Sequence, residues 1–412
     1  MKKNFSILFL ISILAINSTI TALAATPRST SIGTRWGAVV DTTDAAEEFN
    51  EHMENIGFRG YLETIPTINK MNSTLLENNV LMFAGHGSPM GVFFNYKYKG
   101  GDYATGIYYG DSKEVIFEDD GETYQMAGMG DYDWNDTLLA IFCACKTGKN
   151  ESNITKAAYE NGVDFSIGWR EITQTEDLDK WLSRFGTYLE NGMMLIDAMT
   201  KASNGSGYTG KNTVRNIAAF SSSISVNNLV LSDYVNNYRS SNNKTSNDNI
   251  ITVNEDIEYS FDKKDMTDVE KYIRQNIDSQ FDINRFDIND YINVIVEDSG
   301  DVYGSLFLDY KVGDFVTEDG YYIAIKNSEV KDIYINGNPS CSRNDILTIK
   351  EDIDEDELKL KAIEQTELGK NEEIVEQKII KKYDTEPYYV VVNGIENKTI
   401  GAFRGESFEY RF

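Results

Sequence analysis

The stretches VLMFAGHG (80–87) and LLAIFCAC (138–145) decide the fold of this 412-residue chain. Each is a continuous apolar run that ends in small and reactive residues. Continuous apolar runs suit strands that are buried on both faces of a parallel sheet. We therefore expect two central strands, at 80–84 and 138–142, with His86 and Cys145 just beyond them.

The sequence around these two runs alternates between strand and helix patterns from residue 33 to about 220. Strands are expected at 36–40, 61–65 and 163–169, and helices at 44–56, 175–190 and 193–202. Such alternation predicts an α/β fold, a parallel sheet with helices on both faces. Ligands bind such sheets beyond the carboxyl ends of the strands, which is where His86 and Cys145 are expected.

The remaining sequence divides into an insertion, a linker and a second region. The stretch 90–134 is rich in Gly, Tyr and Asp, and we expect a hairpin around 101–117. The polar sequence at 239–250 predicts a linker after an α/β domain at 26–238. Residues 251–412 are expected to form an α+β accessory region, with a helix at 266–277 and strands at 321–325 and 388–392.

The N-terminus has the pattern of a removable signal peptide at 1–25. Lys2 and Lys3 precede an apolar run at 5–16, and Ala22-Leu-Ala24 precedes the expected cut. The run is too short to cross a bilayer, so we expect a secreted, extracellular protein without membrane insertion; an uncleaved anchor is the alternative.

The charge balance is strongly acidic. Removing the two lysines with the signal peptide would change the formal net charge from −27 to −29. Such a chain should repel nucleic acid and anionic membranes and could attract cationic substrates or bind calcium loosely, and a well-solvated surface is the alternative interpretation. The oligomeric state does not follow from the sequence.

Reactive side chains are few, since the chain has three cysteines and two histidines. A thiol attacks a carbonyl as the thiolate, which an imidazole can generate, and backbone N–H groups must stabilise the oxyanion. His86 and Cys145 fit these two roles, with the N–H groups of Gly87 and Cys145 as the oxyanion donors. Cys143 still belongs to the strand and is expected to be a packing thiol, and His52 to be a partly exposed helix residue.

The pair VLMFAGHGS and LLAIFCACKTG resembles the caspase-like (clan CD) cysteine peptidases. That group includes caspases, clostripain, gingipains, separase and the bacterial CHAT domains. The pattern of an apolar strand then His-Gly, and a later strand then Ala-Cys, maps onto His86-Gly87 and Ala144-Cys145. The resemblance covers about residues 33–205. It implies an endopeptidase that acts on a protein or peptide substrate, works through an acyl-enzyme thioester and is made as a zymogen; the alternative is a catalytically inactive binding module at the cell surface.

The resemblance also implies where substrate binds, near the strand that follows the nucleophile. Trp169 is expected to line that edge. Arg170 would suit an acidic substrate residue, whereas Glu171, Asp177 and Asp164 would suit a basic one. We favour basic residues, because the exported relatives cut after them, and Arg239 and Lys244 in the linker then become candidate self-processing sites.

No cofactor is expected. Asp131, Asp133 and Asn135 imitate the start of a calcium loop, but Phe142 stands where such a loop has glutamate, so calcium is only weakly indicated. Two histidines so far apart in sequence give no zinc-ligand spacing. Cys341 follows an Asn-Pro turn in the accessory region and is expected to be inert.

Overall fold

The computed structural model describes the chain from residue 26 onward, with gaps. The described ranges are 26–36, 40–68, 70–71, 78–98, 101–110, 114–119, 122–129, 134–150, 152–204, 207–208, 214–240, 263–296, 301–312, 315–327, 329–336, 339, 360–361, 363–366, 368, 371–382, 388–398 and 401–411. The expected signal peptide, Asp131, Asp133, Lys244 and Cys341 lie outside the described residues.

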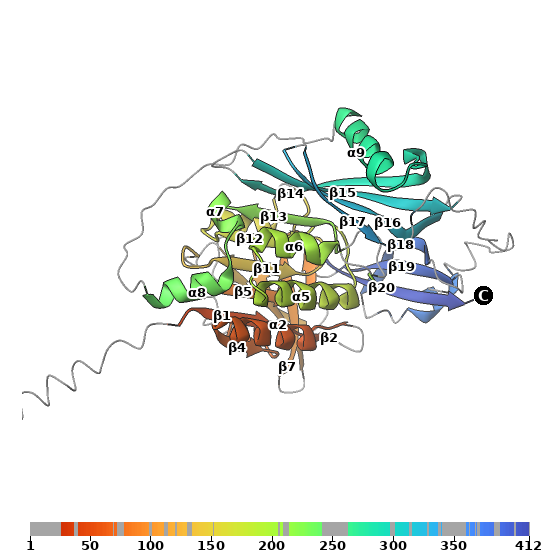
Figure 1. Ribbon diagram of the computed structural model, residues 1–412. Helices are drawn as coiled ribbons and strands as arrows, with labels where there is room; N and C mark the ends of the chain where they lie inside the picture. Colours follow the sequence, from red (N-terminus) through yellow and green to blue (C-terminus); the bar gives the residue numbers. More distant parts are fainter. Residues whose placement is uncertain are drawn as a thin grey trace, which may run out of the picture.

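A parallel sheet forms the centre of the molecule, as the apolar runs predict (Figure 1). An antiparallel strand, β13, flanks it at one edge. In spatial order the strands are β4 (Arg59–Glu63), β1 (Arg28–Ile32), β5 (Val80–Ala84), β11 (Leu139–Cys143), β12 (Phe165–Trp169) and β13 (Ile217–Ser221).

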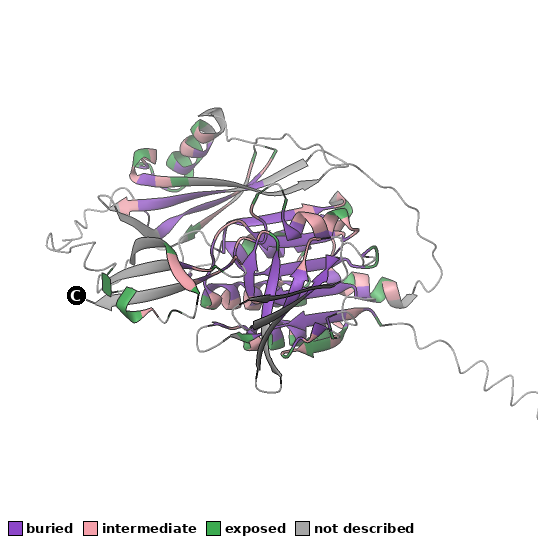
Figure 2. Cartoon of the chain, turned by 180° about the vertical axis from the view of Figure 1, so that it is seen from behind, coloured by how far each residue is buried: buried purple, intermediate pink, exposed green. Residues whose placement is uncertain are grey.

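Both faces of the central strands are buried (Figure 2). One face packs on helices α2 (Thr43–Ile56), α5 (Thr175–Glu190) and α6 (Leu195–Ser203). The other face packs on α4 (Ile154–Glu160) and on residues of the 90–134 insertion. Alternate side chains of one strand therefore enter two different cores, which explains why β5 and β11 are apolar at every position.

The helix predictions are confirmed, and the first strand prediction is wrong. Trp36 and Val40 belong to a separate pair of short strands, β2 (Arg35–Trp36) and β3 (Val40–Asp41). The sheet instead uses β1, whose sequence RSTSI gives no hydrophobic signal although most of it is buried. Small side chains fit between the layers there, and the Thr30 hydroxyl donates a hydrogen bond to Asn78 at 2.9 Å.

The insertion forms two hairpins instead of one. After β6 (His86–Ser88), β7 (Gly91–Tyr98) pairs with β8 (Gly101–Tyr108), and β9 (Glu114–Asp119) pairs with β10 (Glu122–Gly128). Strand β10 also pairs in parallel with β8, so the strands expected to face each other across 101–117 are each paired with another strand.

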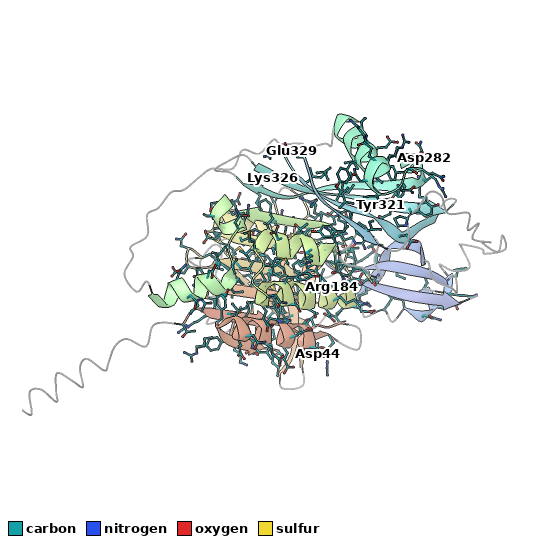
Figure 3. All side chains as sticks on the ribbon, in the orientation of Figure 1. Asp44, Arg184, Asp282, Tyr321, Lys326 and Glu329 are labelled. Atoms are coloured by element: carbon teal, nitrogen blue, oxygen red, sulfur yellow. The ribbon has the colours of Figure 1, made fainter. Side chains whose placement is uncertain are left out.

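The C-terminal region begins with a helix, α9 (Lys263–Asn276), on an antiparallel sheet. That sheet contains β14 (Phe286–Val296), β15 (Asp301–Val312), β16 (Phe315–Lys326) and β17 (Glu329–Asn336). Tyr321 of β16 lies beneath α9 (Figure 3) and shares a core with Val269 and Ile273. Strand β14 pairs in parallel with β13, so hydrogen bonding continues from the α/β sheet into this region.

The last three strands turn back towards the α/β sheet. β18 (Glu372–Lys382), β19 (Tyr388–Asn397) and β20 (Ala402–Arg411) pair antiparallel in sequence order. Strand β20 then reaches β6, where Phe403 pairs with Gly87. In Figure 1, β20 lies beside the end of α5, which it contacts.

The other short elements are α7 (Ile224–Asn227), α8 (Leu231–Ser240) and the 3-10 helix Ile283–Arg285. The first residues of the expected linker, 239 and 240, therefore belong to α8. No helix in the described ranges is long and apolar enough to cross a membrane.

Candidate active site

His86 and Cys145 lie at the ends of two adjacent parallel strands. The register of β5 and β11 places Ala84 opposite Cys143, so the two reactive residues each follow two positions later. Added to Gly87, a Cβ would lie 2.6 Å from the backbone nitrogen of Cys145 and would also clash with its carbonyl oxygen. The two segments are thus in direct contact, and only glycine fits at position 87.

The turn that carries Cys145 is held by Thr147. The Thr147 hydroxyl donates to the carbonyl of Phe142 at 2.8 Å and accepts from the backbone N–H of Trp169 at 3.1 Å. Lys146, between Cys145 and Thr147 in the chain, has a φ of 58°, in the left-handed region that residues with side chains rarely adopt. These bonds offset the backbone strain and fix the direction in which Cys145 leaves the strand.

The thiol of Cys145 contacts the segment that follows β12. Its Sγ donates to the carbonyl of Thr173, and the Thr173 N–H donates back to the sulfur, both at 3.3 Å. Burial raises the pKa of the Cys145 thiol to about 12, although the Thr173 backbone hydrogen bond and the nearby Lys146 charge favour the thiolate.

His86 is buried under the C-terminal strands. Burial lowers its pKa to about 4. The Glu372 carboxylate raises the same pKa, the Arg404 guanidinium lowers it, and a hydrogen bond with the backbone of Phe403 raises it. At neutral pH the ring and the Cys145 thiol are therefore both uncharged in this arrangement.

The two residues expected to supply the oxyanion donors, Gly87 and Cys145, lie in contact, because a Cβ added to Gly87 would lie 2.6 Å from the backbone nitrogen of Cys145. Two backbone N–H groups that point towards one carbonyl oxygen can stabilise its negative charge. That these two N–H groups share such a target stays a prediction.

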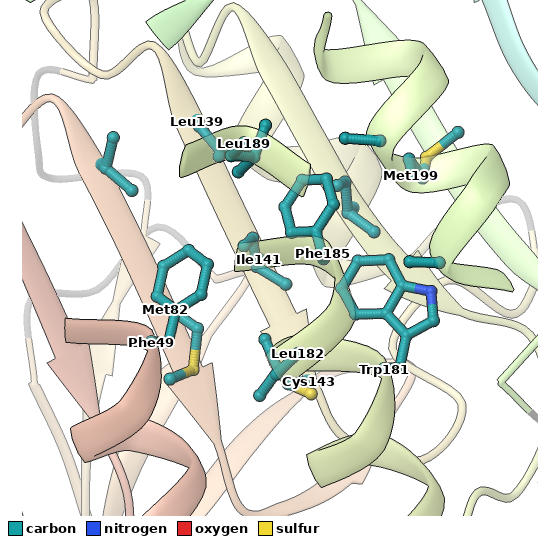
Figure 4. Packing of buried hydrophobic residues seen from close by; sticks show 14 of the residues in the cluster. Phe49, Met82, Leu139, Ile141, Cys143, Trp181, Leu182, Phe185, Leu189 and Met199 are labelled. Atoms are coloured by element: carbon teal, nitrogen blue, oxygen red, sulfur yellow. The ribbon is translucent and has the colours of Figure 1, made fainter. Parts of the chain in front are cut away.

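Cys143 has the packing role expected from its place in the strand. It belongs to the apolar core that also contains Leu182 of α5 and Ile141 (Figure 4). Burial raises its pKa well above the ordinary value of a thiol. Its side chain packs within the strand and Cys145 lies beyond the strand end, so Cys145 remains the candidate nucleophile of these two cysteines.

Two of the expected substrate contacts point into the protein. The Trp169 ring packs edge-on against Trp181, with 5.1 Å between centroids, and its indole N–H donates to the carbonyl of Val214. Asp177 is fully buried and acts on the pKa of Tyr208 together with Arg215. Both side chains stabilise the interior.

The other three expected contacts lie at different places. Asp164 is at the start of β12, the opposite end from the Cys145 turn, and accepts a hydrogen bond from Ser222 at 2.8 Å. Arg170 donates to the carbonyl of Ile217, and Glu171 pairs with Lys149 at 3.5 Å. Of these three, Glu171 is the nearest to the site in structure, because its carbonyl accepts the N–H of Lys146.

The structure adds residues that the sequence did not indicate. Thr173 and Gln174 follow β12, and Glu372, Phe403 and Arg404 come from the C-terminal strands. Thr173 and Gln174 immediately precede the acidic start of α5, which was the only local signal for them. Nothing in the local sequence of β18 or β20 indicates a contact with His86.

The remaining candidates do not join the site. His52 on α2 bonds Glu190 through Nδ1 at 2.7 Å, as expected for a helix surface residue. Within the described ranges, no group of three or more His, Cys, Asp or Glu side chains could hold a metal ion. Asn135 is exposed, and the two aspartates that would complete a calcium loop lie outside those ranges.

No protein-family model matches the chain, and no curated protein matches it significantly.

Proposed function

We propose that this chain is a secreted cysteine endopeptidase of the caspase-like type, with Cys145 as nucleophile and His86 as acid and base. The observation that carries the proposal is the contact between the two strand ends, where Gly87 lies against the backbone of Cys145. A histidine and a cysteine that each follow one of two adjacent parallel strands support the proposal, because acyl transfer needs a thiol and an imidazole at one site together with backbone N–H donors.

The proposed reaction has two halves. Cys145 gives its proton to His86, and the thiolate attacks the carbonyl carbon of the peptide bond, while the N–H groups of Gly87 and Cys145 bind the oxyanion. His86 then protonates the leaving amine as the C–N bond breaks, which leaves a thioester on Cys145. A water molecule, deprotonated by His86, attacks the thioester, releases the acid and restores the thiol.

The proposed substrate is a polypeptide that carries a basic residue before the cut. The formal net charge of −27 attracts cationic chains over a distance. Cleavage of the enzyme itself after Arg239 or Lys244 belongs to the same proposal. Arg239 lies in the last turn of α8, so that helix end would have to unwind to be cut.

The experiment compares wild type, Cys145→Ala, His86→Ala and the matched variant Cys143→Ala on a library of peptides, with cleavage mapped by mass spectrometry. Cys145→Ala and His86→Ala should each lose about 10³-fold or more of the cleavage rate. Cys143→Ala should cleave the same bonds as wild type, because its thiol lies in the core. Equal cleavage of peptides, and of the 239–250 stretch, by Cys145→Ala would remove the proposal.

A second candidate is a non-catalytic binding module with the same fold. The burial of both reactive groups favours it, since His86 is 4% exposed and Cys145 is 3% exposed. Iodoacetamide separates the two functions. In a peptidase, an accessible Cys145 should react with iodoacetamide faster than Cys143, and His86→Ala should slow that reaction. In a binding module, His86→Ala should leave the labelling rate of Cys145 unchanged.

A further inference from the structure

We propose that β20 occupies the groove in which an extended peptide substrate binds, so that the C-terminal strands hold the peptidase in a latent form until β20 is released. This inference rests on the proposed peptidase function. It identifies a binding mode, backbone pairing with an extended chain, and an internal occupant for it.

Strand β20 pairs with the protein on both sides of the nucleophile. Phe403 pairs antiparallel with Gly87, which touches the Cys145 backbone. Two residues later, Gly405 bridges in parallel to Gln174, the neighbour of the residue that contacts the Cys145 thiol. Strand addition of this kind is a common way to bind extended peptides, because main-chain hydrogen bonds supply the attachment.

Phe403 contacts both His86 and the turn that carries Cys145. The Phe403 backbone forms a hydrogen bond with the His86 ring, and the ammonium of Lys146 lies 3.5 Å from the centroid of the Phe403 ring. Lys146 follows the nucleophile in sequence, so Phe403 engages both the acid/base residue and the nucleophile turn. Any substrate backbone must displace it.

The next residue, Arg404, forms a buried ion pair within the C-terminal strands. Its guanidinium donates two hydrogen bonds to the Glu372 carboxylate, from Nε at 3.1 Å and from Nη2 at 2.8 Å. The two side chains are only 4% and 8% exposed, so each charge depends on the other for compensation. Glu372 lies on β18, which is joined to β20 through β19, so the pair can leave the site together with its strands.

Closure also explains the uncharged state of the reactive groups. Displacing β20 brings water to His86 and Cys145, which relieves the burial that keeps both neutral. The thiol then reaches the thiolate state at lower pH. The expected consequence is a gain in nucleophilicity on release.

The test measures iodoacetamide labelling of Cys145 at pH 7.5 in the full chain, with the labelled peptides quantified by mass spectrometry. Glu372→Gln leaves the Arg404 charge buried without its carboxylate, so β20 should open and Cys145 should label about ten-fold faster or more. The matched control is Glu373→Gln, which removes an exposed pair with Lys398 from the same strand and should label like wild type.

A second variant opens the strand without touching the ion pair. Added to Gly405, a Cβ would lie 3.1 Å from the Gln174 side chain and 3.2 Å from the Thr173 carbonyl, so Gly405→Val should push β20 away and speed labelling. If circular dichroism shows that Glu372→Gln is unfolded, this variant decides. Folded variants that label at the wild-type rate would overturn the proposal.

Wild type provides a measurement that needs no substitution. In rising urea, Cys145 should label at a concentration well below the one that exposes Cys143 in the core, because release of β20 is a local opening. Simultaneous labelling of the two cysteines would contradict latency. Fast labelling of Cys145 in Glu372→Gln without cleavage of any peptide would uphold closure by β20 and reject the peptidase function, so the two failures are distinguishable.

Discussion

Two buried arginine–carboxylate pairs among the described residues are built differently. Arg215 precedes β13, and its Nη1 lies 3.8 Å from Oδ1 of Asp309 on β15, with side chains 4% and 1% exposed. Its guanidinium also lies 4.0 Å from the ring centroid of Tyr322. Arg404 and Glu372 are instead held by two direct hydrogen bonds, over His86.

We call the Arg215–Asp309 pair the joint, because it connects two sheets, and the Arg404–Glu372 pair the closure, because it lies within the strands that cover His86. Arg215 belongs to the α/β unit and Asp309 to the C-terminal sheet, so separating the two sheets would break this ion pair. Arg404 and Glu372 belong to one set of three strands and can move into water together. When both partners of an ion pair lie on one moving unit, the unit can detach with the pair intact and little stability is lost. When the partners lie on two units, separating the units breaks the pair.

The largest effect is expected at the joint. Arg215→Met leaves the Asp309 charge buried and should lower the free energy of unfolding by about 3–5 kcal/mol. Glu372→Gln should cost about 1–2 kcal/mol, because β20 can lift and return Arg404 to water. Urea unfolding followed by circular dichroism measures both. The double variant Arg215→Met/Asp309→Leu, which strands no charge, should recover part of the loss; equal losses at the two pairs would erase the distinction.

Acid should weaken the closure through His86. The folded pKa of His86 is about 4 and the unfolded value is about 6.5, so the unfolded chain binds more protons between these values. The free energy of unfolding is therefore not reduced by His86 above pH 6.5, and it falls by up to about 3 kcal/mol as the pH falls to 4. The charged ring would stand beside the Arg404 guanidinium, with Glu372 as the opposing charge.

Urea unfolding at pH 7 and pH 4.5 checks this effect. His86→Asn should weaken the pH dependence in this window, and the remaining dependence reports the other carboxylates. An unchanged slope in His86→Asn would show that the ring is not held neutral by the C-terminal strands.

The smallest effect is expected at Asp179, a partly buried carboxylate whose pKa is raised. Asp179 on α5 is buried in part, and its Oδ1 lacks a hydrogen-bond partner. Burial and the nearby charges of Asp41 and Asp44 raise the pKa of Asp179 to about 7. Its folded pKa lies above the unfolded value, so its stabilising contribution is present below pH 4 and lost as the pH rises through 7.

Because Asp179 is only partly buried, solvent screens much of this shift, so Asp179→Asn should stabilise the protein by about 1 kcal/mol at pH 8 and have little effect at pH 4. Thermal unfolding at the two pH values measures the difference. A loss of stability at pH 8 would mean that Asp179 has a cationic partner after all, and would place it with Asp309 and Glu372.

The sequence predicts the centre of the fold well. Continuous apolar runs identify β5 and β11 because both of their faces are buried, and the apolar period of α5 gives the bounds Thr175–Glu190. The edge shared by His86 and Cys145 follows from the parallel direction of the strands. The sequence does not reveal β1, because Ser29, Thr30 and Ser31 are buried without being apolar.

The reactive residues and the strands beneath them were set by local sequence alone, since burial on two faces selects apolar residues at every position. What covers those residues was decided by the tertiary structure. Phe403 meets Gly87, and Arg404 meets Glu372, across long stretches of chain that carry no local pattern for either contact. Strand pairing uses backbone groups that every residue has, so the place where β20 docks depends on the assembled shape and on one charge pair.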